Sequence, residues 1–197
     1  MPAQIKSTEV NWHDPVRLQF GFYGLSATHS IPIIRELIQE SWPEIRRKRP
    51  CVYVVRLRGV VSIAYGAGHS PVIYIGEGNA YARLYSHSYW ISSLLVSVPN
   101  AEVEIHIAEI AGKNNGYLYK YIEADMIKWF FDEFGCLPWF NQQRETSKES
   151  HYTYGPDAEQ KLTKHISVGS GNKFLWAIRP LPNNDQYKPY GKGAAPS

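Results

Sequence analysis

The chain has only two cysteines, Cys51 and Cys136, and it lacks the closely spaced cysteine pairs of zinc sites and disulfide frameworks. It also lacks an apolar run approaching the ~18 residues of a membrane span, and its first residues contain none of signal-peptide length. These absences argue against a disulfide-stapled scaffold and against a membrane partner. We therefore expect the protein to work in a reducing cytoplasm.

A strong charge of either sign is also absent. Lys and Arg total 21 and Asp and Glu total 18, so the net charge is +3 over 197 residues, with a pI near 8.7. This weakly basic balance permits a polyanionic partner without requiring one. Hydrophobic residues make up 44% and charged residues 20%, which predicts an ordinary globular protein with one core.

Motifs of several enzyme classes are missing from the sequence. GxSxG, HExxH and the Walker pattern do not occur, and the seven histidines are scattered. Any chemistry must therefore come from residues that the fold brings together.

The middle of the chain alternates strand-like and helix-like segments. Strands are predicted by β-branched runs at residues 52–57, 72–76 and 103–108. Helical spacing covers residues 79–96 and 117–134, and Gly135 is suited to ending the second helix. We predict an α+β fold with a small central sheet of about three strands, in the order β-β-α-β-α, and flanking helices.

Segments on either side of this core are predicted to be extensions. Residues 1–50 are predicted to form an N-terminal helical extension with a helix at 29–48, and the core spans 51–141. Residues 142–180 form a C-terminal extension with one strand at 174–178, and 181–197 form a flexible tail. Residues 46–49 are all basic, which suits either the helix C-terminus or a phosphate contact.

Glu123 occupies an unusual position on the second predicted helix. On a helical wheel it falls between Phe130 and Phe134 in the apolar face, whereas the polar face carries Lys120, Asp125, Lys128 and Asp132. A buried carboxylate is costly unless it is paired, protonated or bound to a metal. The wheel alone leaves open both a salt bridge to an arginine of another element and a metal site.

Four further residues carry suitable chemistry. Arg83 and His87 are four residues apart and share one helix face; the guanidinium suits phosphate oxygens, and the imidazole can transfer a proton. Tyr53 and Tyr74 belong to neighbouring predicted strands, so their hydroxyls could converge, although strand tyrosines usually serve packing.

Together these residues resemble the GIY-YIG nuclease family. Tyr74-Ile75-Gly76 matches the second half of its signature, and Cys51-Val52-Tyr53 stands where Gly-Ile-Tyr is found. Arg83 matches the family's catalytic Arg, and His87 matches the companion His of homing-type members. Glu123 matches the metal-binding Glu, and Asn141 matches the downstream Asn. The resemblance covers residues 51–141. Cys51 in place of Gly is expected to be tolerated, because the chemistry belongs to the neighbouring tyrosine.

The resemblance implies phosphodiester hydrolysis by in-line attack of water. Tyr53 would be the general base; a free tyrosine has a pKa of ~10, so Arg83 or another cation must lower it or the proton must leave in concert. One Mg²⁺ or Mn²⁺ on Glu123 would neutralise charge on the phosphate and the leaving oxygen. Arg83 would stabilise the pentacovalent phosphorus. Tyr74 and His87 would position phosphate or water, and Asn141 would orient the site.

The first functional hypothesis is a type II restriction enzyme that cuts DNA, with RNA left open as a substrate. The alternatives are a repair, mobile-element or toxin nuclease of looser specificity and a nucleic-acid-binding module that has lost catalysis. The intact residue set argues against the last. A neighbouring methyltransferase gene would favour restriction, and a neighbouring immunity gene would favour a toxin. A homodimer or higher oligomer is compatible with the sequence.

Residues 54–73, between the two tyrosines, form a longer connection than in most members of the family. Its 56–71 segment carries Arg56, Arg58 and His69 together with several glycines. We interpret it either as a protrusion that meets DNA or as a hairpin that merely extends the sheet. Because surface loops tolerate changes of length, we expect that shortening 59–69 would preserve the fold.

Overall fold

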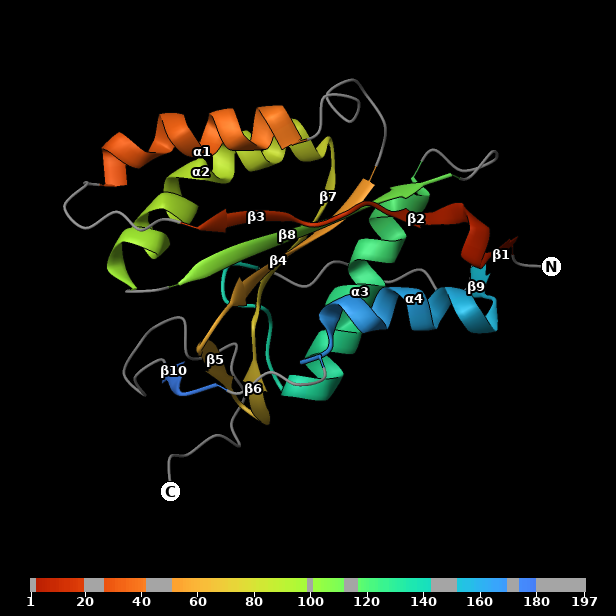
Figure 1. Ribbon diagram of the computed structural model, residues 1–197. Coiled ribbons are helices and arrows are strands. Elements are labelled where there is room, and N and C mark those ends of the chain that lie inside the picture. Colours follow the sequence, from red (N-terminus) through yellow and green to blue (C-terminus); the bar gives the residue numbers. More distant parts are fainter. Residues whose placement is uncertain are drawn as a thin grey trace.

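The protein is described here from a computed structural model. It describes residues 3–19, 27–41, 51–98, 101–111, 117–142, 152–169 and 174–179. The fold is α+β, as predicted (Figure 1). Several expectations fall outside the described residues, namely the end of the first predicted helix, the basic run at 46–49 and the tail at 181–197.

The main sheet has five strands, which is more than the about three predicted from periodicity. The three predicted strands are neighbours in it, with β4 (Cys51–Arg58) between β7 (Val72–Gly78) and β8 (Glu102–Ile110). The segment predicted as an N-terminal helical extension supplies the other two, β2 (Val10–Trp12) and β3 (Val16–Gln19), which both pair with β8. All pairings in this sheet are antiparallel.

β4 is the most deeply buried strand of the sheet. Residues 51–57 are all buried, because both edges of the strand are paired and both faces are covered. Its run of valines suits such a position, since β-branched side chains pack well on a pleated surface. β8 instead alternates buried and half-buried residues, as its sequence predicts.

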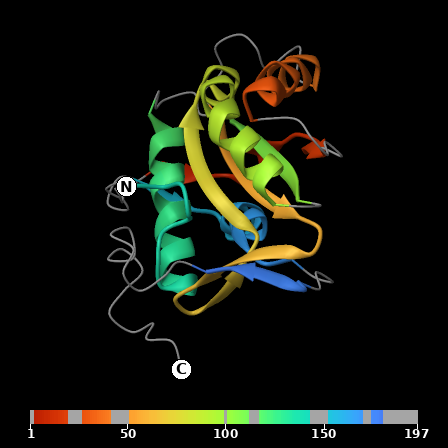
Figure 2. The ribbon, with the colours of Figure 1, turned by 90° about the vertical axis from the view of Figure 1, so that its left-hand side faces the viewer.

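Four helices cover the sheet. α1 (Ala27–Ser41) and α2 (Ala80–Ser97) lie on one face, and α4 (Pro156–Ile166) lies on the other (Figure 1). α3 (Leu118–Phe134) stands beside β7 (Figure 2). It ends as predicted at Gly135, whose φ of 75° permits the left-handed turn and whose N–H donates to the Phe131 carbonyl at 2.8 Å.

Two smaller sheets complete the fold. One pairs β1 (Ala3–Ile5) with β9 (Tyr152–Tyr154), and η1 (Ser7–Glu9) follows β1. The other has the order β10–β5–β6, formed by β10 (Trp176–Ile178), β5 (Val61–Tyr65) and β6 (Gly68–Ser70). β9 and α4 were not predicted.

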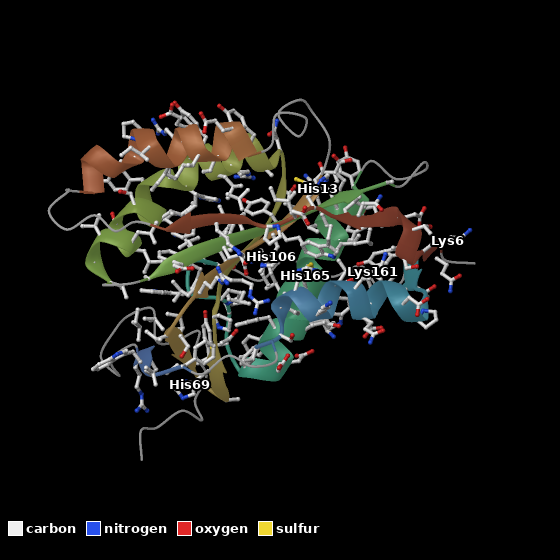
Figure 3. The ribbon with its side chains drawn as sticks, in the orientation of Figure 1. Lys6, His13, His69, His106, Lys161 and His165 are labelled. Atoms are coloured by element: carbon white, nitrogen blue, oxygen red, sulfur yellow. The ribbon has the colours of Figure 1, made fainter. Side chains whose placement is uncertain are left out.

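Arg56 holds α4 against the sheet and is not available to nucleic acid. Its side chain is buried and donates to three carbonyls at the C-terminal end of α4, those of His165, Ser167 and Val168. This is the end of a helix where a cation is stabilised. Nearby, the His165 ring stacks on Trp12 with centroids 3.7 Å apart, and its Nδ1 lies 3.1 Å from Nδ1 of His106 on β8 (Figure 3).

The β5–β6 hairpin belongs to the hydrophobic core and is not a free protrusion. Val61, Ile63 and Tyr65 are buried, and the Tyr65 ring meets Phe130 of α3 edge to face at 5.1 Å. The Tyr65 hydroxyl also donates to the Val72 carbonyl. The expectation that residues 59–69 could be shortened without harm is therefore wrong.

Tyr65→Ala should lower the free energy of unfolding by about 3–5 kcal/mol, the usual cost of deleting a buried aromatic side chain, and replacing 59–69 with a short turn should cost at least as much. Urea unfolding measures both. His69→Ala, at an exposed position of the same hairpin, should change stability by less than about 0.5 kcal/mol. Equal midpoints for Tyr65→Ala and His69→Ala would contradict the assignment of the hairpin to the core.

Candidate active site

The register between β4 and β7 brings the two predicted tyrosines together. Tyr53 pairs with Gly76, and Val55 pairs with Tyr74. Paired residues share a face, as do residues two apart along a strand. Tyr53 and Tyr74 are therefore diagonal neighbours on the face that α2 covers, and their ring centroids lie 5.9 Å apart.

Gly76 is required by space. A Cβ at this position would lie 2.5 Å from Cζ and Oη of Tyr53 and 2.6 Å from Cε1 of Tyr74. No side chain fits there, because both rings lie over the glycine backbone. The glycine that ends the Tyr-Ile-Gly motif thus lets the two tyrosines approach each other.

α2 adds the predicted histidine and arginine. Asn79 caps the helix by accepting a hydrogen bond from the Ala82 N–H at 3.1 Å. Nε2 of His87 lies 3.1 Å from the Tyr53 hydroxyl oxygen, and the His87 ring lies 4.7 Å from the Tyr74 ring. Arg83 is one turn earlier; its side chain is 58% exposed, and Nη2 lies 4.0 Å from Oε1 of Glu77.

Glu123 is buried on α3, as predicted, with 9% of its surface exposed. Its charge raises the pKa of both Tyr53 and Tyr74, whereas the charge of Arg83 lowers them. The carboxylate and the guanidinium therefore act on the same pair of hydroxyls. Tyr53, Tyr74 and His87 are thus in contact, and Arg83 and Glu123 act on the two hydroxyls through their charges.

Asn141, the sixth, contacts the backbone of β7. Its Nδ2 donates to the Ile75 carbonyl at 2.8 Å, and its Oδ1 accepts from the Ile75 N–H at 3.0 Å. The Phe140 N–H donates to the Ile73 carbonyl at 2.9 Å. The chain after α3 is thus hydrogen-bonded to the edge of β7 beside Tyr74, which makes Asn141 a positioning residue.

Burial keeps the two tyrosines and His87 uncharged near neutral pH. Burial is the largest cause of the raised pKa of Tyr53, and the neighbouring Tyr74 raises it further. Burial also raises the pKa of Tyr74. For His87, burial and then the charge of Arg83 lower the pKa to about 4. Near neutral pH the tyrosines are therefore phenols and His87 is an uncharged imidazole.

The donor set suits a hard cation shared with a substrate better than an all-protein cage. Within the ranges that the structure describes, no group of three or more His, Cys, Asp or Glu side chains is placed to hold a metal. Mg²⁺ commonly uses one or two carboxylates and takes its other ligands from water and phosphate. Glu123, whose charge acts on the two tyrosine hydroxyls, fits that pattern.

Two aromatic side chains beside this site were not predicted from the sequence. The Trp90 ring of α2 stacks on Phe140 at 4.2 Å, and it also lies against His87 at 5.5 Å. The only available signal was the three-residue spacing of His87 and Trp90 on one helix. The contact with Phe140 depends on how the chain returns after α3.

No protein-family model, curated protein or solved structure matches this chain. In the described part, no helix is long and apolar enough to cross a membrane. The resemblance to the GIY-YIG nucleases therefore rests only on the residues of this chain that match the family's motif.

Gly76→Ala should displace Tyr53 or Tyr74, because the new methyl group would occupy the space of both rings. We expect a lower melting temperature, at a cost of about 1–3 kcal/mol, and a changed near-ultraviolet circular dichroism signal. The control is Gly78→Ala, where φ is 98° but nothing lies within 4 Å of the added Cβ. That variant should lose stability through backbone strain yet keep the aromatic signal; matching spectra for Gly76→Ala and wild type would refute the close approach.

Proposed function

We propose that this protein is a divalent-metal-dependent endonuclease of the GIY-YIG type that hydrolyses phosphodiester bonds in DNA, as a type II restriction enzyme does. The observation that carries the proposal is the group formed by Tyr53, His87 and Tyr74 over Gly76. Arg83 and Glu123 act electrostatically on the same hydroxyls. A general base, a phosphate-binding cation and a carboxylate are the parts that such a hydrolysis requires.

Tyr53 acts by proton relay in this proposal. Its raised pKa argues against a standing phenolate, and the uncharged His87 offers an acceptor nitrogen at 3.1 Å. The Tyr53 oxygen takes a proton from the attacking water while its own proton passes to Nε2 of His87. The water oxygen forms the new bond to phosphorus as the bond to the leaving oxygen breaks, and the leaving oxygen takes a proton from solvent.

The two charged side chains serve the phosphate. Arg83 is exposed enough to meet a phosphate from solvent, and its planar fork can stabilise charge on the phosphoryl oxygens in the transition state. Glu123 would hold Mg²⁺ or Mn²⁺, which supplies Lewis-acid stabilisation of negative charge when bound. Tyr74 is placed to donate a hydrogen bond to a phosphate oxygen.

Incubating the full chain with plasmid DNA and Mg²⁺, then mapping the ends, tests the function directly. Ends at one short sequence support a restriction enzyme, and scattered ends support a nuclease of looser specificity. Intact plasmid with both Mg²⁺ and Mn²⁺, over a range of protein concentrations, would overturn the proposal.

Glu123→Gln should abolish cleavage while leaving the fold intact, because the amide has nearly the same shape but is a poor ligand for Mg²⁺. We expect a loss of at least about a hundredfold in single-turnover rate, as for other groups that stabilise transition-state charge. Glu133→Gln, at an exposed position of the same helix, is the matched control and should cut normally. Wild-type cleavage by Glu123→Gln would show that the metal assignment is wrong.

The pH dependence tests the role of His87. The relay needs an unprotonated imidazole, so lowering the pH below its pKa removes activity. Because that pKa is depressed to about 4, single-turnover rates at saturating Mg²⁺ should hold from neutral pH down to about pH 5. His87→Gln, which can accept a hydrogen bond but not a proton, should cut slowly over the same range. Half-maximal activity near the ordinary histidine pKa of about 6.5 would contradict the depressed pKa of His87, and a wild-type rate for His87→Gln would contradict the relay.

A further inference from the structure

A row of aromatic rings leads away from the proposed site. It consists of Tyr74, His87, Trp90, Phe140 and Trp139, all of them half-buried. Trp90 lies 6.1 Å from Tyr74 and stacks on Phe140 with ring planes 20° apart. Phe140 also stacks with Trp139, at 4.9 Å and 23°. We call this set the aromatic row.

The far end of the aromatic row is held in place by the backbone. The Phe140 N–H bonds to β7, and the Asn141 side chain binds both polar groups of Ile75. The backbone N–H of Trp139 donates to the Tyr65 hydroxyl of β5 at 3.2 Å. Because these rings are already fixed, a ligand that stacks on them pays little entropy to order them.

A second surface, at β10, carries exposed apolar side chains. Trp139 contacts β5, which pairs with β10, and the side chains of Leu175 and Trp176 there are each 72% exposed. The backbone N–H groups of both residues donate to the Val60 carbonyl. α2, β7 and β10 face the viewer in Figure 2.

Charge on this surface suits a polyanion. Residues 58–72 and 174–179 contain no Asp or Glu, and the exposed side chains there include Arg58, His69 and Arg179. Arg58 does contact Glu102, but at 3.4 Å and with its own side chain 45% exposed, so the pair is weak and replaceable by phosphate.

We propose that the aromatic row is a stacking platform for unpaired nucleotides next to the cleaved phosphate, an inference that rests on the proposed nuclease function. In an intact duplex the faces of the bases are covered by the neighbouring bases, so the rings of the aromatic row would gain little binding energy from it. Unpaired bases expose those faces, and stacking on aromatic side chains is worth about 1–3 kcal/mol per base. The substrate is then single-stranded DNA or a duplex opened at the point of cleavage.

Binding can be measured without cleavage, in EDTA, by fluorescence anisotropy with the full chain. The probes are a single strand of about 16 nucleotides, its blunt duplex, and a single strand of equal charge with abasic positions. We expect wild type to bind the base-bearing strand more tightly than the other two. Trp139→Ala should weaken binding to the base-bearing strand about tenfold, as loss of one stacked base predicts, and barely change binding to the abasic strand.

Two variants control for the ring and for the surface. Trp139→Phe keeps an aromatic face and should retain most of the affinity, whereas Tyr89→Ala removes a ring that is 68% exposed on α2 but outside the aromatic row and should change nothing. If Trp139→Ala does not fold, quenching of wild-type tryptophan fluorescence decides: the base-bearing strand should quench more than the abasic one.

Equal affinity for base-bearing and abasic strands, equal quenching by both, or tightest binding to the intact duplex would overturn the stacking platform. Each of these results leaves the nuclease proposal standing if plasmid is cut. Conversely, base-dependent binding without any cleavage would overturn the nuclease proposal and, with it, the place of the platform beside a cleaved phosphate, leaving only a surface that stacks unpaired bases.

Discussion

The register of β4 against β7 is the constraint on which the proposed site depends. It sets Tyr53 across from Gly76, whose lack of a side chain lets the ring lie over the backbone. Because side chains alternate along a strand, a slip of one residue would turn Tyr53 to the α4 face and away from His87. Burial on both faces of β4 makes such a slip costly. The site is therefore built on the strand whose pairing register is most strongly specified.

The same strand also explains the position of α4. The pairing of β4 with β7 shifts register between Val55 and Arg56, just after the residues that support the site. Arg56 faces the opposite side from Tyr53 and satisfies carbonyls at the end of α4, groups that a helix leaves without internal partners. One strand therefore carries a proposed catalytic hydroxyl on one face and a helix-binding cation on the other.

Sequence reasoning found the elements that carry a long pattern and missed those that do not. β4, β7, β8, α2 and α3 have clear runs or periodicity, but β2 has three residues and β3 has four, too few to show alternation. α4 could have been predicted from the sequence. Pro156 begins it, Asp157 and Glu159 lie in its first turn, and Lys164 and His165 lie in its last, which are ordinary signals for a helix.

The two carboxylates on α3 mark the limit of the helical wheel. Glu123 was predicted to be buried and is, but Asp125 was placed on the polar face and is in fact only 1% exposed. Tyr152 and Tyr154 of β9 cover it, and their hydroxyls donate to Oδ2 at 2.5 and 2.6 Å. A wheel describes one helix and contains no information about a strand that arrives later in the chain.

Asp125 also bears on how Glu123 is held. Side chains two residues apart on a helix are separated by about 200° around its axis, so these carboxylates point to nearly opposite sides of α3. The hydroxyls of β9 hold the Asp125 side of the helix, and Glu123 lies on the other side. The donors on Asp125 thus restrict rotation of α3 about its own axis.

Burial determines which proton chemistry the site can perform. A phenolate at Tyr53 would lie in a dry environment and within reach of the Glu123 charge, and both effects oppose it. Arg83 favours the phenolate but is more than half exposed, so solvent weakens its effect. For these two side chains the combination of lowest cost is a neutral Tyr53 and a neutral His87. From that state, Tyr53 can act as a base only by giving up its own proton as it receives another, and His87 is the side chain whose nitrogen lies in place to take it.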